Sequence, residues 1–388
     1  NMSIRKSITE ASVSNIIDFA IEIEKQDSRI ARCQVHSGRT IAFITLCAIL
    51  CGYRTWNDIA DYGKYRKEFI ETYVGKMEST PSHDTIARFF NRLSQKKFEG
   101  IYRFWIKEAL TMRRSPMKEN VSKRHIAIDG KELCGAKKDK PIRMVSAYSV
   151  QDGISLGQEE IAEKSNEIPA VQKLIEDIDI KGCVVTADAM HCQKKTCRLV
   201  IEGGGNFFFF LKGNQGTLLE AVKAAVEPAR YRSRNNNDRY EETAHSNRLD
   251  WCSRECIVVG EPRALGELYS EWQWVKSFGV IITQTADRDT YERYFISSLE
   301  MDAKELLNIS RNHWGVENGL HRTLDMTFDE DTSKKKENSA VNFSLAVKTA
   351  MACLALDTSC KSPKRKMTRA ALDPNYLHKL LNLVADTI

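Results

Sequence analysis

Two aspartates stand at the ends of short apolar runs and could share one site. Asp129 follows the run at 125–128, and Asp188 follows the β-branched run at 184–187. Two carboxylates held side by side repel each other, so they either share a proton or bind cations. Mg²⁺ prefers one or two carboxylates per ion, with water and substrate phosphate completing its shell. Two metal ions held this way would activate a water or a terminal hydroxyl and stabilise the leaving oxygen of a phosphodiester.

A third acid comes from a polar stretch at 311–321 that is rich in hydrogen-bond donors. Glu317 would reach the two aspartates if this stretch forms a helix packed beside their strands. The helical period places one carboxylate and two imidazoles on a single face, at i, i+4 and i+8. The residues on and beside that face are His313, Glu317, His321, Arg311 and Asn318.

Simpler interpretations remain open for these residues. The polar face around Glu317 is also typical of a solvated helix, and an aspartate before a glycine, as in Asp129-Gly130, often forms a turn. Zinc could be held on the helix alone, by its two histidines and Glu317, as in a zinc hydrolase, which would leave the aspartates without a role. No second paired ligand motif follows the remaining zinc candidates, which are Cys252 with Cys256, and His191 with Cys192 and Cys197.

The composition is that of a soluble globular protein long enough for two or three domains. The chain has 388 residues, of which 42% are hydrophobic and 28% charged. No apolar run reaches the roughly 18 residues of a membrane helix, and the first residues lack an apolar signal region. We therefore expect a cytoplasmic protein without a membrane partner. The eleven cysteines are scattered and odd in number, which favours reduced core thiols over a disulfide framework.

The net charge of +6 is modest, but basic residues are clustered near the end of the chain. One cluster is Lys334-Lys335-Lys336, and a second lies at 361–369. Such clusters favour a polyanionic partner, although each is equally compatible with a solvated surface. The second cluster contributes three candidate DNA contacts, Lys364, Arg365 and Lys366.

Residues 1–120 predict an all-α N-terminal domain. Its segment 83–93 follows a turn and an N-cap at Thr80-Pro81-Ser82, and a helix there would present Arg88, Asn91 and Arg92 on its polar face. A helix, a short turn and a capped helix with a basic face form the outline of a DNA-binding helix-turn-helix, although any helical bundle contains such a pair. Apolar residues recur at helical spacing over 14–24, 40–52, 56–69, 83–93 and 98–109.

Residues 121–388 predict an α/β catalytic domain. Three antiparallel strands followed by helix, strand, helix, strand form a mixed sheet of the ribonuclease H-like kind, in which the first and fourth strands are neighbours. Asp129 and Asp188 would then lie side by side. The last strand is apolar at every position, which predicts that both its faces are covered. The predicted elements are 126–128, 144–150, 154–158, 168–178, 184–187, 192–202 and 207–211.

A mostly β insertion at about 215–300 separates the fifth strand from the helix that carries Glu317. The polar segment 230–239, which contains Asn235-Asn236-Asn237, predicts a flexible loop. A short helix at 303–309, capped by Asp302, leads into the helix of Glu317. The predicted strands of the insertion are 255–259, 274–283 and 291–299.

Short motifs occur in order along nearly the whole chain. Those around the acids are Ile128-Asp129-Gly130-Lys131, Asp188-Ala189-Met190-His191-Cys192-Gln193, and His313-Trp314 with Glu317-Asn318 and Leu320-His321. The others are Cys51-Gly52, Trp56-Asn57-Asp58-Ile59-Ala60, Pro81-Ser82-His83-Asp84-Thr85, Glu163-Lys164-Ser165-Asn166-Glu167-Ile168, Leu211-Lys212-Gly213-Asn214-Gln215, and the stretch 324–331. In this combination the chain resembles the insertion-sequence transposases of the H-repeat-associated (ISAs) type, within the DDE class.

The resemblance implies a ribonuclease H-like core with Asp129, Asp188 and Glu317 as its acidic triad, binding two Mg²⁺ or Mn²⁺ ions. It implies a transposase that nicks DNA at the ends of its element with water and joins the freed hydroxyl to target DNA. The partners would be double-stranded DNA, both terminal inverted repeats and target, and pairing of two ends indicates a homodimer on DNA. Such a protein would be bacterial and cytoplasmic, and nucleoid-associated when bound. The alternative is a domesticated or inactive relative that only binds DNA.

The surroundings of the glutamate differ from those in larger relatives of the class. The positions that hold a tyrosine, an arginine and a lysine there hold Ser310, His313 and Leu324 here. Phosphate contacts are therefore expected from other side chains near the acids. The candidates are Lys131, His191, Lys212, Asn214, Arg311, His313, Asn318 and His321.

Overall fold

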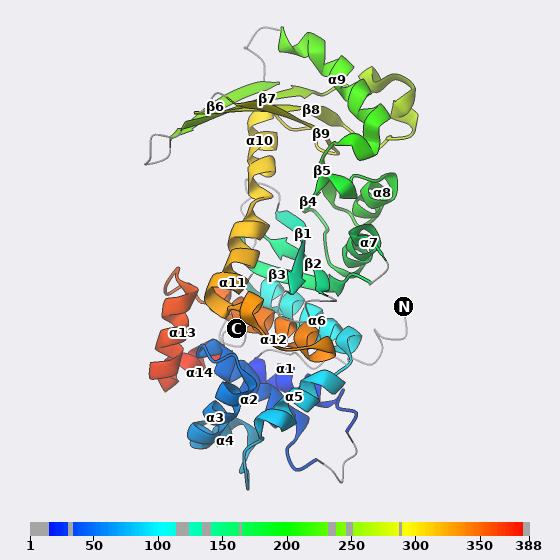
Figure 1. Cartoon of the computed structure of the whole chain (residues 1–388). Helices are drawn as coiled ribbons and strands as arrows, with labels where there is room; N and C mark the ends of the chain where they lie inside the picture. The colour runs from blue at the N-terminus through cyan, green and yellow to red at the C-terminus, as the bar shows by residue number, and fades with distance from the viewer. Residues whose placement is uncertain are drawn as a thin grey trace.

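The computed structural model describes residues 15–29, 34–113, 124–133, 141–162, 165–231, 238–245, 251–286 and 289–382. The domain boundary expected at residues 120 and 121, and the Asn235–Asn237 part of the expected loop, lie outside these ranges. Figure 1 shows helices at one end of the molecule, the first five strands in the middle and the strands of the insertion at the other end.

One mixed sheet of nine strands runs through the described part of the chain, in the order β3-β2-β1-β4-β5-β9-β8-β7-β6. The first three strands are antiparallel, and β4 is parallel to both of its neighbours. This order and these directions make the first five strands a ribonuclease H-like sheet, so the predicted fold class is confirmed. Their bounds are His125–Leu133 for β1, Ile142–Ser149 for β2, Ile154–Glu160 for β3, Val184–Ala187 for β4 and Asn206–Phe210 for β5.

Strand β5 is covered on both faces, as its apolar sequence predicts. Phe207 and Phe209 point into a core that includes residues of helices α7, α8 and α9, whereas Phe208 points into a second core with residues of α10. A strand with only one buried face would alternate polar and apolar residues. The helices are α7 (Glu167–Asp177), α8 (Lys194–Glu202), α9 (Gly216–Arg230) and α10 (Ala303–Asn312).

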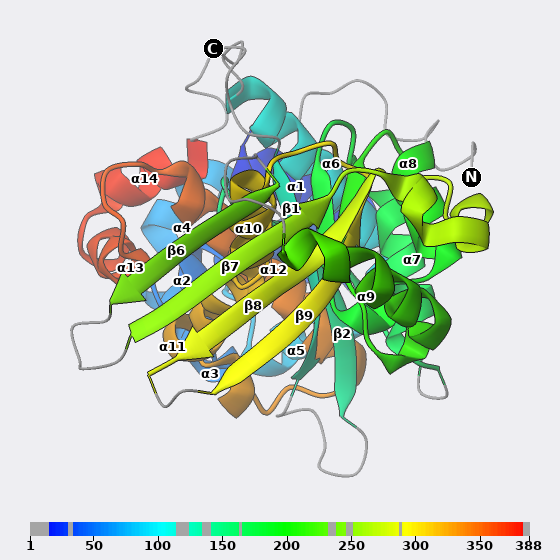
Figure 2. The same cartoon turned by 90° about the horizontal axis from the view of Figure 1, so that it is seen from above.

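The insertion continues the catalytic sheet, because β9 pairs antiparallel with β5. Figures 1 and 2 show α9 on the outer face of the insertion strands and α10 on the inner face. The outermost strand, Arg239–His245, carries charged residues at several positions, as protected edge strands do, and lacks the apolar alternation that would predict a strand. The bounds are β6 Arg239–His245, β7 Trp251–Val259, β8 Ser277–Thr285 and β9 Thr290–Ser297.

The N-terminal helices share one core with helices from the end of the chain. Helix α12 (Glu337–Leu356) packs against α2, α5, α6 and β3, and its apolar residues belong to the same cluster as those of α1 to α6. The segment expected to be one helix at 56–69 is two, because Arg66 leaves the helical conformation. The remaining bounds are α1 Ile16–Glu24, α2 Gly38–Leu50, α3 Trp56–Tyr65, α4 Lys67–Val74, α5 His83–Arg92, α6 Gln95–Arg113, α13 Pro363–Leu372 and α14 Pro374–Asn382.

Helix α12 is long and apolar enough to cross a membrane by length and composition alone, contrary to the expectation that no such segment exists. It is instead the central helix of the core just described, and 89% of its most apolar window is buried inside the protein. The side-chain nitrogen of its polar Asn342 is also paired there, because it donates to the carbonyls of Phe90 at 2.8 Å and Leu93 at 3.0 Å. The length and the apolar composition of α12 are therefore those of a helix in the core of the protein.

Candidate active site

The two aspartates lie at the same edge of the sheet. Strands β1 and β4 are parallel, and Ile128 is paired with Ala187, so the next residue on each strand is an aspartate. Asp129 lies inside β1, which runs on to Leu133, whereas Asp188 comes directly after the last residue of β4. The side chain of Asp129 is 21% exposed and that of Asp188 is 63% exposed. The structure thus brings Asp129 and Asp188 together as the sequence predicts.

Glu317 lies in a π-helical turn, Val316–His321, between α10 and α11 (Arg322–Phe328). The single α-helix predicted for 311–321 is therefore wrong, because the chain widens to i→i+5 bonding at this point. Glycines let this turn approach β2 closely: a Cβ on Gly315 would lie 2.9 Å from Val150, and one on Gly319 would collide with the ring of Tyr148. The side chain of Glu317 remains exposed.

The three acids influence one another electrostatically. Burial raises the pKa of Asp129 to about 6, and the charges of Asp188 and Glu317 add to this effect, although the Gly130 N–H donates to its Oδ1 at 2.9 Å. The pKa of Asp188 is lowered, chiefly by a hydrogen bond with His313, whose Nε2 lies 3.9 Å from Oδ1. A carboxyl with a raised pKa beside one with a lowered pKa is the electrostatic pattern of a cation site.

Comparison with known proteins gives the family. Residues 120–353 match the family model described as the transposase DDE domain, and residues 24–106 match the model of the domain associated with it. The chain belongs to the DDE transposase family. It is 33% identical to an H repeat-associated putative transposase of Escherichia coli K12, YhhI, over 89% of this chain and 92% of that one. It is 31% identical to the putative transposase YncI of Escherichia coli O157:H7 over 95% of both chains. Among solved structures it is similar to a piggyBac transposase synaptic complex with hairpin DNA, with 12% identity and a TM-score of 0.44, over 96% of this chain and 78% of that one.

Three histidines near the acids lie beside three different carboxylates. His313 faces Asp188, whereas His321 Nδ1 lies 3.5 Å from Asp129 Oδ2. His191 is buried, with its Nε2 3.5 Å from Glu167 Oε2. Burial lowers the pKa of His191 and of His321 to about 4, so both imidazoles are neutral near pH 7. Two histidines that contact different acids do not form the zinc set with Glu317 that the sequence left open.

The donor set suits a hard divalent cation, although the side chains do not form a closed cage. In the described ranges, no group of three or more His, Cys, Asp or Glu side chains lies close enough to hold a metal ion. The groups that converge at the edge of the sheet are carboxylates, and carboxylate oxygen is the ligand that Mg²⁺ and Mn²⁺ prefer. Burial raises the pKa of Asp129, and the nearby negative charges of Asp188 and Glu317 add to the shift, so a bound cation would favour its ionised form. Chemistry and charge therefore both fit such an ion.

Glu167 is a fourth carboxylate at the site, and it belongs to one of the motifs that carry the family resemblance but was not predicted as a site residue. A Cβ placed on Gly130 would lie within 3 Å of its carboxyl group, so Glu167 covers the residue after Asp129. Burial raises the pKa of Glu167, and the charge of Asp188 adds to the shift. Its position at the first turn of α7, far from both aspartates in sequence, gave no signal of this contact.

Lys131 is engaged inside the protein. Its ammonium is bonded to Asp325 and lies 3.5 Å from Glu330 Oε2 and 3.5 Å from Asp331 Oδ1, and its side chain is 13% exposed. Since Lys131 lies on β1, two residues after Asp129, this cluster ties α11 and the turn that follows it to the strand of Asp129. The cluster thereby positions the segment that carries Glu317.

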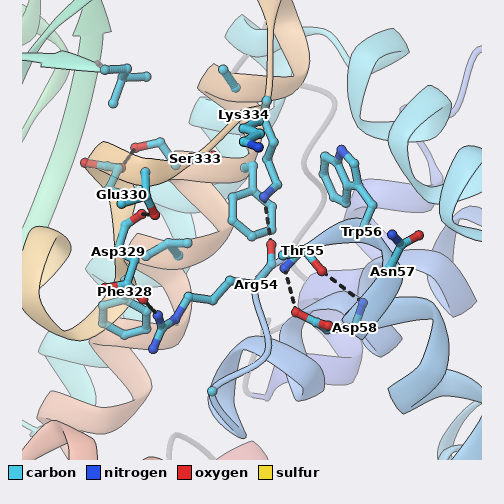
Figure 3. Close-up of a pocket in the computed structure, with 18 of the residues that line it drawn as sticks. Arg54, Thr55, Trp56, Asn57, Asp58, Phe328, Asp329, Glu330, Ser333 and Lys334 are labelled. Carbon is cyan, nitrogen blue, oxygen red and sulfur yellow. Dashed lines mark hydrogen bonds and ion pairs between the residues drawn. The ribbon is translucent and has the colours of Figure 1, made fainter. Parts of the chain in front are cut away.

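A cavity of about 570 Å³ lies beyond this cluster, between the start of α3 and the segment 328–335 (Figure 3). Arg54 forms an ion pair with Asp329 across it. Lys335 donates to the Arg54 carbonyl at 2.7 Å and lies 3.6 Å from the ring centroid of Phe343, and burial lowers its pKa to about 8. The middle residue of the first basic cluster thus joins the N-terminal helices to the catalytic part.

The remaining predicted contacts fall into two groups. Several are exposed, namely Arg88, Arg92, Lys212, Asn318, Lys364 and Arg365. Asn91, Asn214 and Arg311 are exposed as well, but their side chains have partners within the protein: Asn91 Oδ1 accepts from Ser339 N at 3.2 Å, Asn214 donates to the Ala189 carbonyl at 3.1 Å, and Arg311 pairs with Glu242 at 2.8 Å. Lys366 is buried and donates to the Leu354 carbonyl at 2.6 Å. Lys366 therefore caps the end of α12 and has no surface to offer to DNA.

Proposed function

We propose that this transposase cuts DNA at the ends of an insertion sequence and joins them to target DNA, with Asp129, Asp188 and Glu317 holding two Mg²⁺ or Mn²⁺ ions. The observation that carries the proposal is the convergence of three acids that are far apart in the sequence: the pairing of β1 with β4 brings Asp129 and Asp188 side by side, and Glu317 lies close enough for its charge to add to the burial that raises the pKa of Asp129. Structural aspartates at strand ends would not require a third acid from another element.

Ions bound there would supply Lewis-acid activation of the attacking oxygen and charge stabilisation of the leaving one. The chain supplies the arrangement around them. Asp129 is fixed on β1 by its bond to the Gly130 N–H and by the nearby His321, whereas the exposed side chain of Asp188 can adjust to the substrate. Lys212 is exposed and lies close enough to lower the pKa of Asp188. Its ammonium would bind a phosphate next to the scissile one.

DNA binding would extend over the N-terminal helices. Helix α5 presents Arg88 and Arg92 to solvent, and α13 presents Lys364 and Arg365. These side chains would neutralise backbone phosphates of the terminal inverted repeats and of target DNA, with two copies of the chain pairing the two ends. Affinity should then fall steeply as salt rises, since bound phosphates release counterions.

The test is a strand-cleavage assay on DNA carrying the ends of the element, with Mg²⁺ or Mn²⁺. We expect Asp129→Asn, Asp188→Asn and Glu317→Gln each to abolish cleavage while DNA binding persists. Each substitution replaces a negatively charged metal-binding carboxylate with a neutral amide. Glu176→Gln is the matched control, since this exposed acid lies near the start of β4, at the other end of that strand. Cleavage that survives in one of the three variants would remove that residue from the triad.

A further inference from the structure

A chain of hydrogen bonds links a buried histidine, His125, to His313, which lies beside Asp188. His125 is 1% exposed, and its Nε2 lies 2.7 Å from Thr186 Oγ1. The same Oγ1 lies 3.0 Å from His313 Nδ1, and His313 Nε2 in turn lies 3.9 Å from Asp188 Oδ1. Neither His125 nor Thr186 has a part in the function proposed above.

We infer that His125 and Thr186 are positioning residues that hold His313 in the tautomer with its proton on Nε2. His313 then presents a hydrogen-bond donor to the phosphodiester bound beside Asp188. The inference deepens the proposed function and rests on it for the identity of the substrate.

The strands place these residues where such a chain can form. In the parallel ladder His125 is paired with Val184, and Ala127 with Thr186. Side chains alternate along a strand, so His125 lies on the same face of β1 as Asp129, four residues on, and Thr186 on the same face of β4 as Asp188, two residues on. His313, at the end of α10, covers that face. Two sheet strands therefore support the imidazole next to the acids.

The direction of the hydrogen bonds follows from both ends of the chain. A hydroxyl has one proton, so Thr186 can donate either to His125 or to His313. If it donated to His125, His313 Nε2 would be a bare acceptor facing the Asp188 carboxylate. The proton of His125 would then be on Nδ1, a buried atom that has no hydrogen-bond partner. An unpaired buried N–H is costly, so both ends favour donation from Thr186 to His313.

The charge state of the buried histidine agrees with this direction. Burial lowers the pKa of His125 to about 3, so the imidazole is neutral and has one proton to donate. With that proton on Nε2, His125 donates a hydrogen bond to Thr186 Oγ1, and the Thr186 hydroxyl donates a hydrogen bond to His313 Nδ1. Because Nδ1 of His313 accepts this hydrogen bond, the proton of its imidazole is on Nε2, facing the Asp188 side.

The test compares hydroxyl variants in the full-length protein. Thr186→Val removes the hydroxyl and keeps the shape, whereas Thr186→Ser keeps the hydroxyl. Thr196→Val is the matched control, because Thr196 is equally buried and its Oγ1 accepts from Gln172 at 3.2 Å, in helix α8 away from the acids. Two readouts are needed: the ¹⁵N chemical shifts of the His313 imidazole in metal-free protein labelled at histidine, and the cleavage rate at saturating Mg²⁺.

We expect wild-type His313 to show a protonated Nε2 and an unprotonated Nδ1. Thr186→Val should lose this single tautomer and cleave about 10- to 100-fold more slowly, as for other groups that orient residues around a metal site. Thr186→Ser should restore both readouts, and Thr196→Val should change neither. At the other end of the chain, His125→Gln, which retains a donor, should keep more activity than His125→Leu.

A single Nε2-protonated tautomer in Thr186→Val, or a cleavage rate equal to that of wild type, would overturn the inference. Protonation of Nδ1 in wild-type His313 would overturn it as well. Failure of the wild-type protein to cleave element ends would instead reject the proposed function, and the tautomer readout would still test the hydrogen-bonded chain separately.

Discussion

Replacing Asp129 by asparagine should stabilise the metal-free protein at neutral pH, although it removes a proposed catalytic group. Burial, with the charges of Asp188 and Glu317, raises the pKa of Asp129 from 3.8 to about 6. The folded chain therefore binds this proton more tightly than the unfolded chain does, and ionisation lowers stability as pH rises. The difference between the two pKa values corresponds to about 3 kcal/mol, reached in full above about pH 6 and absent below pH 3.8.

The assay is urea unfolding in a chelating buffer at about pH 4 and about pH 7.5, where linkage predicts a small and a large difference. Asp129→Asn should unfold at higher urea than wild type at the higher pH, and the gap should shrink at the lower pH. Saturating Mg²⁺ should reverse the order, because only wild type gains binding energy from the ions. A lower stability of Asp129→Asn at the higher pH, without metal, would refute the electrostatic reasoning.

Asp188→Asn is the control of opposite sign. A hydrogen bond with His313 is the main reason that the pKa of Asp188 is lowered, so its ionised form stabilises the fold above the unfolded pKa. That stability is lost as pH falls through the lowered folded pKa. The variant should therefore be less stable than wild type in the same buffer at neutral pH. Equal effects of the two substitutions would show that general charge removal, and not the local geometry, determines stability.

Three further predictions separate positioning residues from DNA contacts. Lys131→Met should lower the free energy of unfolding by about 3 kcal/mol and slow cleavage, because it leaves the buried carboxylate of Glu330 without its ion pair; urea unfolding and cleavage on the same preparation check this. Asn91→Ala should cost about 1 kcal/mol in thermal unfolding, since it removes the acceptor for the Ser339 N–H at the start of α12. Arg88→Ala should leave stability unchanged and reduce the salt dependence of DNA affinity, measured by titration at several salt concentrations.

The sequence predicted the pair of aspartates because each follows a short apolar run and the two runs pair in parallel, with Ile128 opposite Ala187, although β1 continues beyond Asp129 to Leu133. Asp129 and Asp188 each come directly after one of the two short runs that pair with each other in the sheet. The same reasoning failed to predict His125, which lies at the start of β1 and becomes relevant only through Thr186 and His313. Such contacts depend on which face of each strand the helix α10 covers. The order of residues within a strand does not show which face that is.

The irregular backbone around Glu317 is a second feature that the sequence did not predict. A 3.6-residue period was assumed around Glu317, whereas two glycines and the aromatic ring of Tyr148 bring the chain close to β2 and allow a π-helical turn. The last element predicted from the sequence ends at residue 321, and in the described part of the chain the helices α11, α12, α13 and α14 follow it. Helix α12 is buried around nearly its whole circumference, so it lacks the amphipathic pattern by which a surface helix is predicted.

The place of α12 has a consequence for synthesis of the protein. The ribosome releases α1 to α6 first, but their buried side chains stay uncovered until residues 337–356 emerge. By that time every strand of the sheet has already been translated. Messages cut short inside the gene would then yield aggregation-prone fragments that are degraded, and not DNA-binding competitors of the intact enzyme.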